Sequence, residues 1–278
     1  MRGRTFPFFV ALAFTGAAAF AAAQQTALPP AQTPAPQLPP ASVNSLSVVV
    51  IDPAHGGADP GARGSAGIVE SEVVLNFARF LRIALEGQGL RVVLTREDNE
   101  NPSFDDRSAI ANGQHGAIFI TLHVSSTGPA GTVRVYSEPA PTSPPPAAGV
   151  TPQTGAANPS RSSQSVQMPA PAFSIGAPAA HPGMVNWDHA QDSYLDRSRE
   201  FAALLQAQMS QRFRGSPPTP LLAAVRQLRT VAAPAIAIEV SSVSIPDRAL
   251  LDQMASVLAD GVARAVADFK PIYEAGAK

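Results

Sequence analysis

Four side chains in this sequence have the chemistry of a hydrolytic metal site: His55, Glu70, His123 and Glu239. Two imidazoles and one carboxylate are enough to hold a zinc ion, because a catalytic zinc site takes three protein ligands and keeps one position for water or substrate. A second carboxylate, not bound to the metal, can accept a proton from that water. The set predicts metal-assisted hydrolysis of an amide without a covalent intermediate.

Three of the four residues follow or close short apolar runs, namely 48–51 before His55, 117–122 before His123 and 234–238 before Glu239. Such runs, alternating with helical patterns, predict a single α/β domain with a mostly parallel central sheet flanked by helices. Ligands of these sheets gather outside the carboxyl ends of the strands. We therefore expect the three side chains to share one rim of the sheet.

The hydrophobic spacing predicts the remaining elements in turn. We expect strands over about 46–52 and 90–94, helices over 71–86 and 105–112, a long helix over 188–213, a strand over 222–228 and a last helix over 246–269. The chain from Leu46 onward is long enough for one domain with a proper core.

A series of motifs gives the chain a family resemblance: HGGADPGA at 55–62, VLTR at 93–96, DRSAIAN at 106–112, GTVRVY at 131–136 and PAIAIE at 234–239. In this order and spacing, from about Leu46 to Phe269, the chain resembles the zinc-dependent N-acetylmuramoyl-L-alanine amidases. These cell-wall hydrolases have a His, Glu, His metal triad. The resemblance implies a phosphorylase/hydrolase-like amidase fold, zinc held by His55, Glu70 and His123, and Glu239 as the catalytic base.

The resemblance also supplies a substrate, peptidoglycan, cut at the amide between N-acetylmuramic acid and the L-alanine of its stem peptide. It allows a protein activator. Two other functions stay open, a catalytically inactive wall-binding or regulatory module on the same fold and a zinc peptidase that cuts within the stem peptide.

Each ligand has a structural alternative. His55 could cap a loop between a strand and a helix, and His123 could be a core histidine at a strand end. Glu70 alone would be a solvated or helix-capping carboxylate, with Glu72 as a rival. Only the resemblance makes Glu70 a ligand.

The surroundings of these residues leave further choices. Glu239 could be a structural carboxylate paired with an arginine such as Arg226, since a buried carboxylate without a partner is costly. Asp52 or Asp59 could hold the second ring nitrogen of a zinc-bound histidine. We interpret three histidines as bystanders: His115, His181 and His189.

The chain departs from the family pattern at three places. Ala54 stands where glycine is common, Val124-Ser125-Ser126 where Ala-Asn-Ser is usual, and Ser241-Ser242 where Gly-Phe is usual. The triad and base are unaffected. These changes bear on the floor of the cleft and so on the preferred stem peptide.

Composition excludes several classes of function. A formal net charge of −1 gives no sign of a nucleic-acid partner. The absence of cysteine leaves histidine and carboxylate as the metal ligands.

The amino-terminal residues 1–23 have the pattern of a signal peptide, with Arg2 and Arg4 before an apolar stretch and Ala21-Ala22-Ala23 at its end. The alternative is an uncleaved anchor, but the apolar stretch is shorter than the ~20 residues that a bilayer requires. We expect export to the periplasm or the medium, with no stable membrane span after cleavage.

Two segments lack the pattern of folded sequence. Residues 24–45 are rich in Pro, Ala and Gln and predict an extended linker. Eleven prolines lie between Glu138 and Pro182, so we expect a disordered insert over about 138–183 within a catalytic domain of residues 46–274. The family allows this segment to cover the zinc cleft. Without an acidic residue between Glu138 and Asp188, we favour a passive segment.

Overall fold

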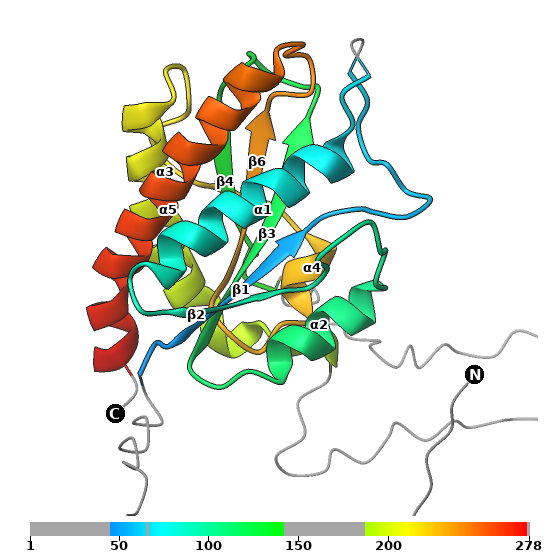
Figure 1. Ribbon diagram of the computed structural model, residues 1–278. Coiled ribbons are helices and arrows are strands. Elements are labelled where there is room, and N and C mark those ends of the chain that lie inside the picture. The colour runs from blue at the N-terminus through cyan, green and yellow to red at the C-terminus, as the bar shows by residue number, and fades with distance from the viewer. Residues whose placement is uncertain (1–44, 65–66, 142–186, 277–278) are drawn as a thin grey trace, which may run out of the picture. The chain divides into compact units, whose positions relative to one another are not determined.

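The structure is a computed structural model and describes residues 45–64, 67–141 and 187–276. These residues form an α/β domain around a six-stranded sheet (Figure 1). Its strands are β1 (Val48–Pro53), β2 (Arg91–Leu94), β3 (Ala117–Ser125), β4 (Val133–Ser137), β5 (Leu221–Leu222) and β6 (Ala235–Ser241). Its helices are α1 (Glu70–Glu86), α2 (Phe104–Asn112), α3 (Leu195–Arg212), α4 (Arg226–Arg229) and α5 (Arg248–Ala275), with 3₁₀ turns η1 (Trp187–His189) and η2 (Asp192–Tyr194).

The strand order is β2-β1-β3-β6-β4-β5. Strands β2, β1, β3 and β6 are parallel, and β4 runs antiparallel to β6. The expected mostly parallel α/β sheet is therefore confirmed. The expected domain limits of 46–274 stay a prediction. So do the signal peptide at 1–23 and the linker at 24–45, of which the structure describes only Ser45.

Alternation along the strands divides the core between the two faces of the sheet, because successive side chains point to opposite sides. Ile118, Ile120 and Leu122 of β3 pack in the larger core, which α1, α3 and α5 cover. Phe119 packs in the smaller core with Leu228 of α4. By this alternation His123 and Glu239 lie on the face of the sheet that carries the smaller core. The helices on that face, α2 and α4, are short.

Both His123 and Glu239 lie inside their strands, whereas the sequence predicted strand ends there. Pairing continues because Val124 opposite Val240 adds two buried side chains to the larger core. His123 and Glu239 are themselves neighbours in register across β3 and β6.

Three predicted elements differ from the structure. The expected strand over 222–228 is the two-residue β5 followed by helix α4, because the Leu228 side chain packs in the smaller core.

The expected helix over 188–213 begins only at Leu195, after η1 and η2. Buried Gln191 fixes this break, because its side-chain amide donates to the carbonyls of Val231 and Ala233 at 2.7 and 2.9 Å.

The last helix begins at Arg248, two residues later than expected, because the Asp247 side chain caps it. It also extends to Ala275, beyond the predicted end at Phe269. Phe269 stacks on Phe201 of α3 at 4.9 Å between ring centroids, and Tyr273 lies one turn further against Phe269. The added turn is thus held by aromatic contacts.

The expected insert begins later than predicted. Glu138 is buried and accepts a hydrogen bond from the Val225 backbone N–H at 3.1 Å, and it pairs with Arg229 at 3.4 Å. Residues 138–141 therefore belong to the described domain. The rest of the predicted insert, up to residue 183, lies outside the described residues.

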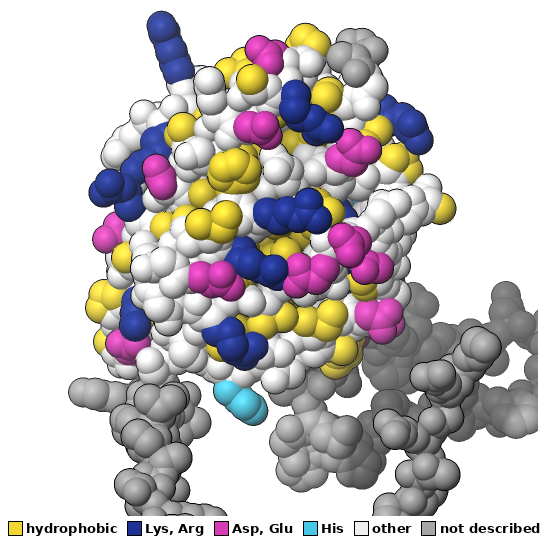
Figure 2. Space-filling view, viewed as in Figure 1, with side chains coloured by type: hydrophobic (Ala, Val, Ile, Leu, Met, Phe, Trp, Pro, Cys, Tyr) yellow, Lys and Arg dark blue, Asp and Glu magenta, His cyan; other side chains and the backbone are white. Residues whose placement is uncertain are grey.

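The outer face formed by α1, α3 and α5 carries both signs of charge interspersed (Figure 2). Arg248 of α5 and Glu72 of α1 form an exposed pair at 3.3 Å, and such pairs contribute little stability. No helix in the described part of the chain is long and apolar enough to cross a bilayer.

Candidate metal centre

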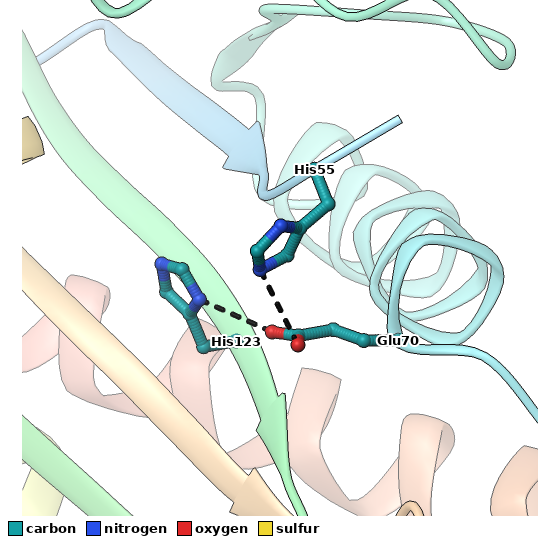
Figure 3. A group of neighbouring side chains, drawn as sticks. All are labelled: His55, Glu70 and His123. Atoms are coloured by element: carbon teal, nitrogen blue, oxygen red, sulfur yellow. Dashed lines mark hydrogen bonds and ion pairs between the residues drawn. The ribbon is translucent and has the colours of Figure 1, made fainter. Parts of the chain in front are cut away.

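Three of the predicted site residues meet at one point of the domain. Ligand atoms of His55, Glu70 and His123 all lie within 4.8 Å of one another. His55 comes from the loop after β1, Glu70 is the first residue of α1, and His123 comes from β3 (Figure 3). The rival carboxylate Glu72 is exposed and faces Arg248 at 3.3 Å, away from the cluster.

The Glu70 carboxylate lies between the two imidazoles. Its Oε2 is 3.3 Å from Nε2 of His55, and its Oε1 is 3.1 Å from Nδ1 of His123 (Figure 3). Backbone N–H groups of Ala62 and Val124 donate to the same two oxygens at 2.8 and 3.0 Å. The loop before α1 and the end of β3 thus fix both carboxylate oxygens.

These contacts set the charges within the cluster. Burial favours a raised pKa for the Glu70 carboxyl, but hydrogen bonds with both imidazoles and with the two backbone N–H groups hold that pKa well below its usual value. The hydrogen bond to Glu70 raises the pKa of His55 to about 9, with a smaller contribution from Asp59. The ionised Glu70 carboxylate therefore favours a positive charge between the two imidazoles.

Asp59 is the partner of the second nitrogen of His55, at 2.8 Å from Nδ1. This contact leaves Nε2 directed at Glu70, the arrangement that metal-bound histidines commonly have. Asp52, the other candidate, is buried elsewhere and accepts hydrogen bonds from Thr95, Thr121 and Arg107.

The loop that carries His55 has an unusual backbone held by arginines. His55 has φ of +62°, a left-handed conformation that is uncommon for residues other than glycine. Arg107 donates to the His55 carbonyl at 3.0 Å, and Arg96 donates to the Ala54 carbonyl at 3.0 Å. Both arginines lie within the quoted motifs, so the motifs hold the histidine in place.

Glycine is required at position 61 because this residue touches the cluster. A Cβ there would lie 2.6 Å from Oε2 of Glu70 and 2.7 Å from Cδ2 of His55, and φ is +66°. The backbone of the loop therefore packs directly against Glu70 and His55, two of the three candidate ligands.

Glu239 lies beside His123 on β6 and is paired with Arg134 of β4. The guanidinium also donates to the Thr127 carbonyl at 3.0 Å and to Ser241 Oγ at 3.1 Å. The arginine pairing given above as the structural alternative for Glu239 thus exists, but with Arg134 in place of Arg226. Arg226 instead stacks on the ring of Phe104, 4.5 Å from its centroid.

Sequence reasoning missed Arg134. Its signal was the alternation of 133–136, which places Arg134 on the face opposite Val133 and Val135. The antiparallel register that sets it opposite Glu239 crosses more than a hundred residues and has no local signal.

Two hollows flank the cluster. One of about 300 Å³ is lined by residues that include His55, Asp59 and Phe104. The other, of about 400 Å³, is lined by residues that include His123, Tyr136 and Glu239. Arg226 and Gln227 line both hollows, so α4 forms their shared wall.

The histidines predicted as bystanders remain apart from this site where the structure describes them. His115 is exposed, and His189 faces Asp192 at 3.0 Å. His181 lies outside the described residues.

The donor set fits a metal ion. Two imidazole nitrogens and a carboxylate converge, they are the donor types that zinc binds, and a carboxylate orients one of the imidazoles. The protein is thus an α/β domain with a His-Glu-His cluster that fits a metal site. A family model described as N-acetylmuramoyl-L-alanine amidase matches residues 49–268, so the chain belongs to that family.

Individual relatives match shorter segments. The chain is 39% identical over 85 residues to a sporulation-specific N-acetylmuramoyl-L-alanine amidase of Bacillus subtilis, covering 30% of this chain and 33% of that protein. It is 43% identical over 77 residues to an N-acetylmuramoyl-L-alanine amidase of Escherichia coli, covering 27% of this chain and 26% of that protein. The matches thus span a third or less of these curated relatives.

Solved structures share the fold. An N-acetylmuramoyl-L-alanine amidase of Nostoc punctiforme superposes with a TM-score of 0.54 at 20% identity, covering 81% of this chain and 98% of that one. An amidase of Clostridium difficile superposes with a TM-score of 0.53 at 19% identity, covering 81% and 97%.

Proposed function

We propose that this protein is a zinc-dependent peptidoglycan amidase that hydrolyses the amide between N-acetylmuramic acid and the L-alanine of the stem peptide. The observation that carries the proposal is the convergence of His55, Glu70 and His123 in a chain of this family. A catalytically inactive module would have no need of a complete donor set supported by Asp59 and by two backbone N–H groups.

The three clustered residues are the proposed zinc ligands. Zinc, when bound, supplies Lewis acidity that polarises an amide carbonyl and makes water a better nucleophile. Asp59 keeps Nε2 of His55 directed into the site, and Gly61 leaves room for the Glu70 carboxylate.

Glu239 is the proposed catalytic base, because it is the carboxylate next to His123 that is not part of the cluster. Its carboxylate accepts a proton from the attacking water and returns it to the leaving nitrogen, so no covalent intermediate is needed. Arg134 holds one oxygen of that carboxylate and fixes its direction.

We also propose an extracytoplasmic location, since the family consists of cell-wall amidases and residues 1–23 have the pattern of a signal peptide. Peptidoglycan is then the macromolecular partner. A protein activator stays a prediction of the family resemblance.

The test uses chelator-treated protein and dye-labelled peptidoglycan. We expect dye release to be absent without metal and to return with one equivalent of zinc. The Glu239→Gln variant should bind zinc normally but release dye about 10²- to 10⁴-fold more slowly, the usual effect of losing a general base. Undiminished release by this variant would place the base elsewhere, and loss of zinc would make Glu239 a ligand.

A further inference from the structure

We propose that Arg226 binds a free carboxylate on the peptide side of the substrate and so selects the stem peptide; this inference rests on the amidase function proposed above. Arg226 lines both hollows beside the metal cluster. A substrate that reaches the cluster through either hollow therefore passes its guanidinium.

The guanidinium is held in place without being neutralised. It stacks on Phe104 at 4.5 Å, and a guanidinium stacked on an aromatic face keeps the N–H groups at its edge available for a carboxylate. All 21 aspartates and glutamates of the chain lie within the described residues, and none of them forms an ion pair with Arg226.

Neighbouring arginines differ in this respect. Arg107, which also lines the first hollow, is buried and paired with Asp52. Arg134 is paired with Glu239, and Arg229 of the same helix with Glu138. Arg226 and Arg229 are both exposed, but Arg229 is paired with Glu138, so among these four Arg226 is the exposed cation without a carboxylate partner.

The chemistry of the substrate supplies a matching anion. Once the lactyl group is joined to L-alanine as an amide, the sugar has no charge, and the free carboxylates lie on the peptide. A planar guanidinium can form two parallel hydrogen bonds with a carboxylate, which fixes both position and direction. Arg226 would thus distinguish the peptide side of the scissile amide from its sugar side.

The experiment compares two synthetic N-acetylmuramoyl peptides that differ only at the second residue of the peptide, which has either a free α-carboxylate or its carboxamide. We expect kcat/KM to be roughly 10- to 100-fold higher for the carboxylate, as expected for a hydrogen bond to a charged group. Arg226→Gln should abolish this preference mainly through KM, and Arg226→Lys should keep part of it.

Arg229→Gln is the matched control, because it removes the same charge from the same helix at a guanidinium paired with Glu138. It should leave the preference unchanged. A wild-type protein with no preference, or an Arg226→Gln variant that slows both substrates equally, would overturn the inference.

A binding measurement separates this inference from the proposed function. Calorimetry with zinc-loaded Glu239→Gln and the two product peptides should show tighter binding of the carboxylate form, and the preference should vanish when Arg226→Gln is added. If this preference is found but the zinc-loaded wild-type protein cuts neither substrate, only the amidase function is contradicted. Equal binding of the two peptides would contradict the role of Arg226 whatever the turnover.

Discussion

At the scale of single residues, Glu70 organises the site. Both of its carboxylate oxygens are fixed, each by one imidazole and one backbone N–H. Isolated from these partners, a carboxylate in the first turn of a helix would be an ordinary surface group. Its environment, and not its residue type, makes it a candidate ligand.

We predict that one zinc ion binds per chain, and that His55→Ala reduces the bound zinc to below about half an equivalent, because two remaining ligands hold zinc poorly. Metal analysis by mass spectrometry after loading and dialysis measures this. His115→Ala is the control, since His115 is exposed and away from the cluster, and it should keep its zinc. Full zinc in His55→Ala would show that the ion binds elsewhere.

The structure brings the three residues together as expected. His55 and His123 could be found because they follow or close apolar runs, whereas Glu70 was named only through the family resemblance. Their role as zinc ligands stays a prediction.

The sequence did not predict Arg134, since cross-strand register depends on how two distant segments pair. It also could not choose between Asp52 and Asp59, because that choice is decided by the path of the loop after β1.

At the scale of elements, the site depends on a row of neighbours across three strands, His123 of β3, Glu239 of β6 and Arg134 of β4. The two departures from the family pattern at Ser125 and Ser241 lie at this row, because both hydroxyls contact Arg134. The Arg134 guanidinium thus contacts both Ser125 and Ser241 and also the proposed base, Glu239.

We predict that Arg134→Met lowers the free energy of unfolding by about 1–3 kcal/mol in metal-free protein, because it leaves the half-buried Glu239 carboxylate without its partner. Denaturant titration measures this change. Adding Glu239→Gln should recover most of the loss, since a neutral amide needs no counter-ion. Additive losses in the double variant would show that the two side chains do not interact.

The loop between β1 and α1 offers a second prediction at this scale. Gly61→Ala should weaken zinc binding by roughly 10- to 100-fold, because its Cβ would displace two candidate ligands. Gly67→Ala is the control, as Gly67 also has a positive φ, of +75°, but nothing lies within 4 Å of its Cβ. Competition with a zinc-binding dye compares the two, and equal affinities would show that the loop adapts.

Most elements followed from hydrophobic spacing, but the segments at 222–228 and at the start of 188–213 did not. The run at 222–228 is apolar enough for a strand, yet tertiary packing of Leu228 makes it a turn and a helix. The predicted helix over 188–213 was interrupted in the same way by a single buried glutamine, Gln191, whose hydrogen bonds reach distant carbonyls.

At the scale of the whole molecule, one α/β domain carries every residue of the proposed site. The segment 142–186 connects two parts of this domain whose described ends are close, because Pro141 and Asp188 line the same hollow. Its composition offers little apolar surface to the core.

We predict that replacing residues 142–183 by a short Gly-Ser linker leaves the melting temperature and the turnover unchanged, because loop-closure entropy varies slowly with length. Thermal unfolding and dye release from labelled peptidoglycan measure the two properties. The replacement begins at residue 142, since buried Glu138 and its neighbours up to 141 belong to the domain. A roughly tenfold rise in turnover, about 1.4 kcal/mol in barrier, would show that the segment shields the metal.

The central claim is tested most directly by digesting purified sacculi with zinc-loaded protein and identifying the soluble products by mass spectrometry. We expect intact stem peptides that begin with L-alanine and glycan strands stripped of peptide, with neither product formed by Glu239→Gln. Peptides cut within the stem would instead identify a zinc peptidase. No soluble product from zinc-loaded wild-type protein would contradict the proposed amidase and favour a binding or regulatory module.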